Sequence, residues 1–406
     1  MQASAQPLEP LPYHLALRDY LKQNEAELWR WFSSAKAQED CTESLRLELL
    51  KHTYRLDATT HAELYARAEA AKSKLGLAVP VTLYQSQQAL ARNVTFFHIP
   101  GEAHIAFQGD VLSLLSPAEL TSSLGHELAH ALLWQAENGE FLVLDRVVQT
   151  MATDQRAAPS HFQTARRLQL YTEIYADRGS LLATGDLHSV VSNLVKLQTG
   201  MQQVSAESYL QQADEIFAAG QPRTEESTHP ETFMRARALR LWSEGAEETQ
   251  TEIERMIEGP LALNELDLLG QKRLTELTWR FLTVYLKPRW FQTESVLGQA
   301  RLFFNDFQPP APGHADQALF DELRSSDPKL QKYLCFVMLD FATRDPELER
   351  VPLAAAFELA KRLDLTGKLE ELANRELRIT KKELAKIKRE AEETLAAAEI
   401  KSDEPA

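Results

Sequence analysis

The chain has 406 residues, a formal net charge of −15, two cysteines and only 15 glycines against 59 acidic and 44 basic residues. The scarcity of glycine disfavours β architectures with many tight turns, and the acidic balance disfavours a protein that tracks nucleic-acid phosphates. The start of the chain lacks a basic segment followed by an apolar one, and no apolar run approaches the ~18 residues that cross a bilayer. Cys41 and Cys335 lie far apart and outside any CxxC pattern, which suits a reducing compartment. Together these features predict a soluble, helix-rich, cytoplasmic protein without an integral membrane segment.

The first part of the chain predicts helices that pack on a small sheet. From Tyr13 to Leu75, apolar residues recur at the three-to-four spacing typical of helices, and Gly76 ends the last of them. Residues 79–84 have the β-branched and aromatic composition of a strand. Two more strand-like segments, Val94 to Ile99 and His104 to Phe107, flank a Pro-Gly pair and predict a hairpin. We therefore expect a sheet of about three strands.

The next helix has the most strongly marked beginning in the chain. Ser116 stands as the N-cap, Pro117 occupies the first helical position, and Glu119 is placed to complete a capping box. The helix is expected to run to about Glu137, where Asn138-Gly139 offers a left-handed stop.

Helices predominate in the rest of the chain. Ser160, with Gln163 three residues later, repeats the cap signal and predicts a second helix to Thr184. Further helices are expected over residues 186–197, 206–219 and 231–243, and the pattern after Gly245 is helical except for a Pro/Gly-rich segment. We therefore predict a mainly α (α+β) chain with a small mixed sheet. Its expected parts are a first domain (residues 1–245), an all-helical C-terminal domain (246–406) and a linker at about 307–315.

The residues that indicate chemistry lie in the middle of the first capped helix. His126 and His130 are one helical turn apart, so their imidazoles project from the same face and can share a metal ion, with Glu127 about a quarter-turn away. This is the arrangement in which two neutral imidazoles bind Zn²⁺ and the carboxylate takes a proton from the metal-bound water. The other interpretation is a partly buried helix that happens to carry two histidines.

A catalytic zinc ion needs a third protein ligand, and the spacing narrows the choice. The metzincin pattern needs a glycine three residues after His130 and a histidine three residues beyond it, but Leu133 and Ala136 occupy these positions. A ligand about nineteen residues after His130 would fall on Gln149, whose neutral amide is a poor zinc ligand. Glu173 and Asp177 are four residues apart on an apolar helix face, where carboxylates must be paired or metal-bound. We predict Glu173 as the third ligand and Asp177 as an acceptor for a ligating imidazole N–H.

These motifs, GHELAH at residues 125–130 and EIYAD at residues 173–177, resemble those of the M48-type gluzincin zinc metallopeptidases. The resemblance extends in order over about residues 60–243, and the absence of apolar spans makes the soluble branch the relevant comparison. It implies a zincin-like peptidase domain with two zinc-bearing helices and one Zn²⁺ per chain. It also implies that an edge strand, Val94 to His98, pairs with an extended substrate.

The resemblance extends to two later residues and, more faintly, to the C-terminal part. His229 is similar to a family histidine that donates to the oxyanion or occupies the open metal position; its loop context is equally consistent with an ordinary surface histidine. Arg235 matches a family arginine that fixes this loop through a carboxylate. From about residue 316 the sequence resembles helical TerB-like domains, in which Asp340 and Asp345 would be candidates for a metal-responsive site, although helix-end carboxylates explain them better.

The function expected from these residues is a zinc metalloendopeptidase that acts on peptides or unfolded proteins. His126, His130 and Glu173 would bind the metal, and Glu127 would act as the general base. One alternative is a non-catalytic or gated zinc-binding adaptor that regulates a stress response through a protein partner of its C-terminal helices. A second alternative is a helical scaffold in which the histidine pair is accidental. No nucleic-acid partner is expected, and the substrate and the oligomeric state are left open.

Overall fold

A computed structural model describes residues 8–34, 42–87, 91–220, 222–226, 228–308 and 317–403. The chain forms two compact units, which are considered separately: residues 1–259 with 267–269, and residues 260–266 with 270–406. The boundary predicted after residue 245 coincides with the end of a helix, and the next helix still packs in the first unit. Most of the predicted linker at about 307–315 lies outside the described residues, and Phe307 at its start is buried.

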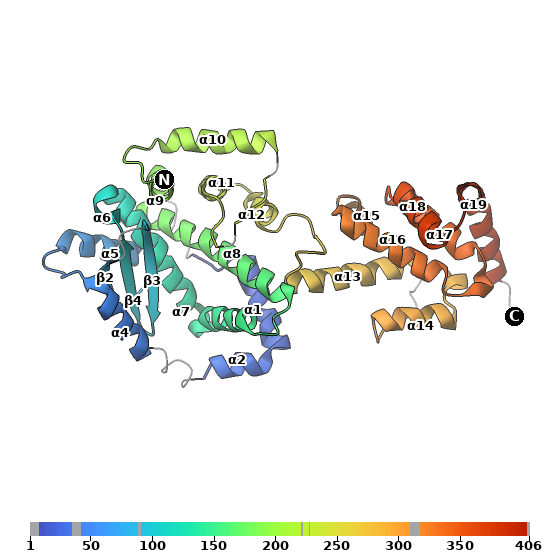
Figure 1. Cartoon of the computed structure of the whole chain (residues 1–406), viewed down its shortest axis with the longest axis horizontal. Helices are drawn as coiled ribbons and strands as arrows, with labels where there is room; N and C mark the ends of the chain where they lie inside the picture. The colour runs from blue at the N-terminus through green and yellow to red at the C-terminus, as the bar shows by residue number, and fades with distance from the viewer. Residues whose placement is uncertain are drawn as a thin grey trace. The chain divides into compact units, whose positions relative to one another are not determined.

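A mixed four-stranded sheet forms one side of the first unit (Figure 1). Its strands are β1 (Thr53–Arg55), β2 (Val81–Ser86), β3 (Asn93–Ile99) and β4 (Glu102–Gln108), in the order β1-β2-β4-β3. β3 and β4 form the predicted antiparallel hairpin, and β2 runs parallel to β4. β1 was missed in the sequence because it is three residues long, with exposed polar side chains, and directly follows a helix.

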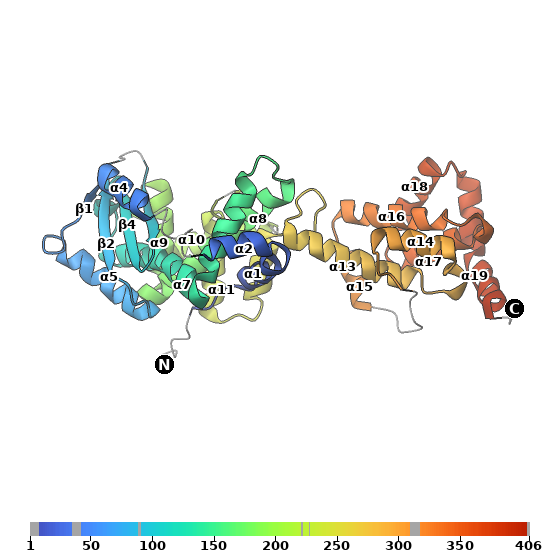
Figure 2. The ribbon, with the colours of Figure 1, turned by 90° about the horizontal axis from the view of Figure 1, so that it is seen from below.

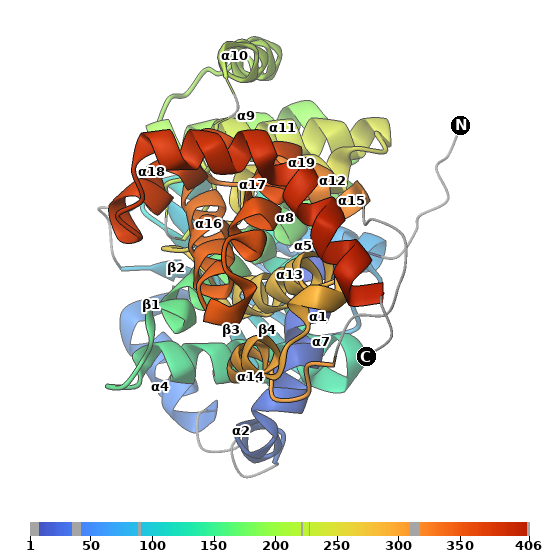
Figure 3. The ribbon, with the colours of Figure 1, turned by 90° about the vertical axis from the view of Figure 1, so that its right-hand side faces the viewer.

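Helices surround this sheet and form the rest of the first unit (Figures 1 and 2). They are α1 (Pro12–Asn24), α2 (Ala26–Phe32), α4 (Thr42–His52), α5 (Ala62–Leu75), α6 (Val111–Leu114), α7 (Pro117–Thr153), α8 (Pro159–Thr184), α9 (Leu187–Thr199), α10 (Ala206–Ala219), α11 (Thr232–Glu244) and α12 (Thr249–Ile257). One apolar core joins α5, α7 and the sheet, and another joins α1, α7, α8 and α12. The amphipathic helix α10 packs on α9 and α11 at the edge of this unit (Figure 3).

The beginnings of α7 and α8 show where cap signals are reliable. Ser116 caps α7 as predicted, because its backbone N–H donates to Glu119 and its hydroxyl accepts from the Glu119 N–H. Ser160 was wrong as a cap: α8 begins at Pro159, and Ala158 stands at the N-cap without a side-chain bond. Proline favours the first helical position, so the proline at residue 159 starts the helix before Ser160.

Helix α7 continues beyond its predicted end. The left-handed stop exists, since residues 136–139 leave the helical conformation and Glu137, Asn138 and Gly139 have positive φ. The chain then resumes a helical course to Thr153. The kink therefore divides α7 into two helical segments, and both contribute to the site described below.

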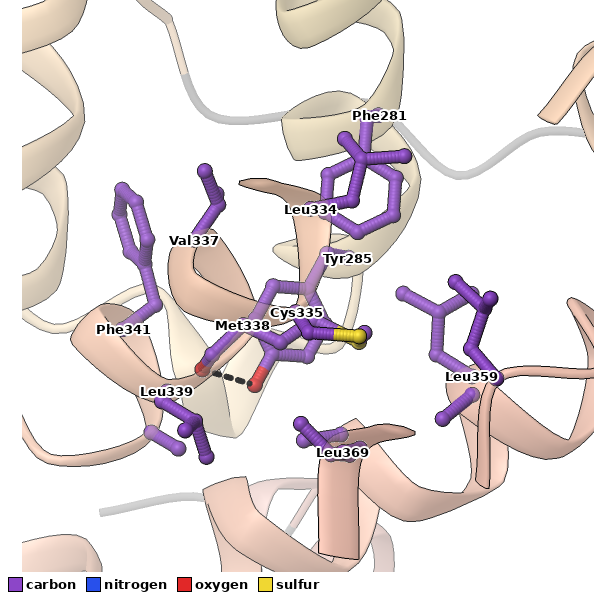
Figure 4. Packing of buried hydrophobic residues seen from close by; sticks show 14 of the residues in the cluster. Phe281, Tyr285, Leu334, Cys335, Val337, Met338, Leu339, Phe341, Leu359 and Leu369 are labelled. Carbon is purple, nitrogen blue, oxygen red and sulfur yellow. Dashed lines mark hydrogen bonds between the residues drawn. The ribbon is translucent and has the colours of Figure 1, made fainter. Parts of the chain in front are cut away.

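The second unit is all-helical. It contains most of α13 (Leu268–Tyr285), then α14 (Glu294–Phe303), α15 (Gln317–Arg324), α16 (Pro328–Ala342), α17 (Val351–Arg362), α18 (Thr366–Glu376), α19 (Lys381–Asp403) and short 3₁₀ turns at Arg289–Phe291 and Pro346–Leu348. Figure 4 shows Cys335 in its apolar core, beside Tyr285, whose hydroxyl donates to the Met338 carbonyl. Burial raises the pKa of the Cys335 thiol to about 11, which makes it unreactive.

These observations confirm the predicted fold class, which is mainly α with a small mixed sheet. Among the described residues, no helix combines the length and the apolar character needed to cross a bilayer. Asp345 caps the turn at Pro346–Leu348 and accepts a hydrogen bond from Thr293. Asp345 and Asp340 do not belong to the cluster of possible metal ligands found among the described residues.

Candidate metal centre

The site is built where α7 and α8 cross at close range. Both helices carry a glycine at the crossing: a Cβ added to Gly125 would lie 2.4 Å from the Ala183 Cβ, and one added to Gly179 would lie 2.3 Å from the Ala129 Cβ. Larger residues at either position would force the helices apart. The absence of a side chain thus lets the face of α7 with the histidines meet the face of α8 with Glu173 and Asp177.

His126, His130 and Glu173 converge at this crossing. The Nε2 atoms of the two histidines are 3.3 Å apart, and the Glu173 carboxylate lies 3.3 Å from His126 and 3.8 Å from His130. One ligand atom from each residue falls within 4.8 Å of the others. Sequence reasoning placed these three residues together, and the structure brings them together.

The donor atoms of this cluster fit a divalent metal ion. Glu173 is 3% exposed, and its Oε2 atom accepts no hydrogen bond from the described residues, although nitrogen atoms of His126, His229 and Arg235 lie 3.3, 3.5 and 3.5 Å away. An ionised oxygen that accepts no hydrogen bond is costly to bury, and a metal ion between it and the imidazoles would lower this cost. Two imidazole nitrogens and a carboxylate are the donor set of many catalytic zinc sites, which leave one position open.

Asp177 and Arg235 lie behind this cluster. The Asp177 carboxylate accepts from His126 Nδ1 at 3.1 Å and from Nε and Nη2 of Arg235, at 2.7 and 2.6 Å. Burial alone would raise the pKa of Asp177, but Arg235 outweighs it and holds this pKa below its usual range. The ionised carboxylate therefore fixes the His126 ring with Nε2 facing the cluster. Arg235 reaches the site itself and comes within 3.5 Å of Glu173.

The electrostatics of the cluster are those of a cation site. Burial lowers the pKa of both histidines, and for His130 it prevails and brings the pKa to about 4. At His126, the hydrogen bonds and charges of Asp177 and Glu173 prevail over burial and raise the pKa. Two carboxylates therefore surround a point at which a positive charge is strongly favoured.

Glu127 lies beside the cluster, between α7 and the edge of the sheet. It is 6% exposed, and burial raises its pKa to about 8, with a hydrogen bond from the Phe96 backbone N–H acting in the opposite direction. Phe96 belongs to β3, which pairs only with β4 among the described strands. The carboxyl group of Glu127 therefore lies next to the open edge that the sequence predicts as a substrate-binding strand.

His229 approaches the cluster from the loop before α11. Its Nε2 atom lies 3.5 Å from Glu173 Oε2, while about half of its side chain stays exposed. Arg166 anchors this loop, since its guanidinium donates to the Glu226 and Thr224 carbonyl oxygens at 2.9 Å each. Arg166 was not singled out in the sequence. Its role depends on backbone atoms, which leave no signal in the side-chain pattern.

The cluster opens into a cavity of about 700 Å³. The residues that line it come from the start of β3, both segments of α7, from α8 and α9, and from the loop and first turn of α11. Sequence reasoning included Phe96 in the predicted substrate-pairing strand but missed Trp134 and Asp145 as lining residues. Asp145 could not be found from helical spacing, because the kink at residues 136–139 breaks the register with the histidines.

Comparison with known proteins agrees with this geometry. The family model described as peptidase family M48 matches residues 61–243, the span over which the sequence resembles that family. The chain carries an M48 peptidase domain. The matched residues include β2, β3 and β4, together with α7 and α8, and extend into α11, so the whole cluster lies within them.

A curated relative belongs to the same family. The plastoglobule-localized metallopeptidase 48, chloroplastic, of Arabidopsis thaliana is 26% identical over 183 residues, which covers 41% of this chain and 52% of the relative. The chain therefore spans about half the length of this relative. No solved structure matches the chain.

Proposed function

We propose that this chain is a zinc-dependent metalloendopeptidase that cleaves peptides or unfolded proteins. Its metal ligands are His126, His130 and Glu173, and it binds one zinc ion per chain. The observation that carries the proposal is the convergence of these three side chains around a buried Glu173 oxygen that accepts no hydrogen bond among the described residues. The M48 domain and a peptide-sized cavity beside the cluster support it.

The residues around the metal ligands have separate roles in this proposal. When bound, zinc would supply Lewis-acid chemistry that activates water and polarises the peptide carbonyl. In its ionised form, Glu127 accepts a proton from the attacking water and later delivers it to the leaving amine. Asp177 and Arg235 act as positioning residues, because they fix the His126 ring.

His229 is assigned a role at the oxyanion. Its Nε2 atom faces Glu173 from a loop that does not belong to α7 or α8, and a donor at this position can stabilise negative charge that develops on the carbonyl oxygen. The open edge of β3 would align an extended peptide by backbone hydrogen bonds.

Glu127→Gln tests the assignment because it removes the base and leaves the ligands. We expect this variant to retain about one zinc ion per chain by metal analysis and to cleave an unfolded protein, such as reduced β-casein, about 10²–10⁴-fold more slowly. Glu207→Gln, at an exposed carboxylate on α10, serves as the matched control and should cleave like the parent. Parental activity in Glu127→Gln would refute the assignment of the base.

The same measurements separate the proposed peptidase from a gated adaptor. His229 is the group that favours the adaptor, since a histidine at 3.5 Å from Glu173 is close enough to close the open metal position. A non-catalytic adaptor would bind zinc without cleaving any substrate, also in His229→Ala, whereas a site gated by His229 would gain activity in that variant. A cytoplasmic location and a protein partner of the C-terminal helices stay predictions.

A further inference from the structure

The charge of the cavity is unbalanced once the metal site is set aside. Outside the metal site its carboxylates are Asp145, Glu226 and Glu231, whereas its guanidinium groups are those of Arg92 and Arg235. Arg235 is paired with Asp177, and Arg92 donates to Asp110 at 2.7 Å. Both cations are thus already engaged, and the cavity keeps an excess of negative charge that favours cationic substrate groups.

Aromatic side chains form part of the cavity wall. Phe96 on β3 and Trp134 on α7 both line the cavity. The centre of the Phe96 ring lies 5.4 Å from that of the Trp134 ring, which in turn lies 5.4 Å from that of the His98 ring. Phe96 and Trp134 therefore present a shared aromatic surface to the cavity.

Asp145 follows the kink in α7 and lines the same cavity as Phe96 and Trp134. Burial raises the pKa of Asp145 to about 6, and its side-chain hydrogen-bond partner is the neutral amide of Gln149. The neighbouring Arg146 charge acts on this carboxyl in the opposite direction and lowers its pKa. A carboxylate in this position gains from a cationic partner in the cavity.

We propose that Asp145, with Phe96 and Trp134 as walls, forms a subsite that takes a lysine or arginine side chain of the substrate. The aliphatic stem would lie along the aromatic rings, and the cationic end would meet the Asp145 carboxylate. This inference rests on the proposed peptidase function and adds a substrate class to it. Asp145 does not belong to the metal cluster, so its role in this proposal is to determine specificity.

Binding tests this subsite independently of cleavage. The probes are three fluorescein-labelled alanine-based nonapeptides that differ only in a central lysine, glutamine or glutamate. The full chain with Glu127→Gln, loaded with zinc, should bind the lysine peptide about ten-fold or more tightly than the glutamine peptide, as a charge-assisted hydrogen bond allows. The glutamate peptide should bind most weakly.

Matched substitutions assign this preference to one residue. Asp145→Asn, added to Glu127→Gln, should abolish the preference for lysine, whereas Asp154→Asn at the exposed end of α7 should retain it. Equal or undetectable binding of the three peptides, or a lysine preference that survives Asp145→Asn, overturns the proposal.

Cleavage by the parent chain separates a failure of the proposed subsite from a failure of the proposed peptidase function. Sites mapped in reduced β-casein by mass spectrometry should carry lysine or arginine at one fixed position near the scissile bond, and Asp145→Asn should remove this enrichment. Cleavage without the enrichment refutes the subsite and leaves the peptidase intact. Binding with the lysine preference but without cleavage refutes the peptidase and leaves the subsite.

Discussion

The close crossing of α7 and α8 makes a sharp prediction for Gly179→Ala. The new methyl group would lie 2.3 Å from the Ala129 Cβ, and 3.3 Å from both the Gly125 carbonyl oxygen and the Leu8 Cδ2. Carbon atoms in contact need about 3.5–4.0 Å, so the helices must separate by more than ~1 Å at this point. Overpacking of this kind costs about 1–3 kcal/mol, and the better helix propensity of alanine returns at most ~1 kcal/mol.

The expected result is a net loss of about 1–2 kcal/mol in the free energy of unfolding of the first unit, measured by urea denaturation. Ala129→Gly removes the colliding methyl group and should itself cost about 2 kcal/mol, from the lost CH₃ burial and the helical glycine. If the collision is the cause, the double variant will be at least ~1 kcal/mol more stable than the sum of the single effects. Additive effects would refute the reasoning, because they would mean that the two positions do not meet.

Two further predictions concern buried ionisable groups of the first unit. His14 accepts the Leu11 N–H at Nδ1 and contacts Thr172 at Nε2; burial lowers its pKa to about 3, so the unfolded chain protonates first, near pH 6.5. The free energy of unfolding should therefore fall as the pH drops below about 6.5, and this residue should account for about 2 kcal/mol of the loss at pH 5. In urea denaturation, His14→Gln should show a pH dependence that is smaller by this amount. Lys196 donates to Glu119 at 2.9 Å, and both side chains are buried. Lys196→Met leaves the Glu119 carboxylate buried without its partner, so the free energy of unfolding should fall by about 3–5 kcal/mol, and adding Glu119→Gln should recover part of this loss. An unchanged denaturation midpoint in Lys196→Met would contradict this expectation.

Sequence patterns predicted the elements whose causes are local. The start of α7 follows from Ser116, Pro117 and Glu119, three neighbouring residues that satisfy the first backbone N–H groups. The hairpin of β3 and β4 follows from two β-rich segments around a tight turn. The common face of His126 and His130 follows from helix geometry alone.

Other features could not be predicted because their causes are not local. β1 is a strand only because its backbone pairs with β2, and its own polar residues carry no strand pattern. The resumption of α7 after the kink depends on the apolar core that Phe141, Leu144 and Val147 enter.

The sequence by itself determined which groups can bind a metal: two imidazoles one turn apart and a pair of carboxylates on another helix. Only the tertiary structure decided that these groups meet, because the distance between helices depends on contacts such as those at Gly125 and Gly179. It also decided that β3 lies at the open edge and that Asp145 lines the same cavity. Periodicity determines which side chains share a face of one helix. A binding site also requires the relative placement of several elements, and packing determines that placement.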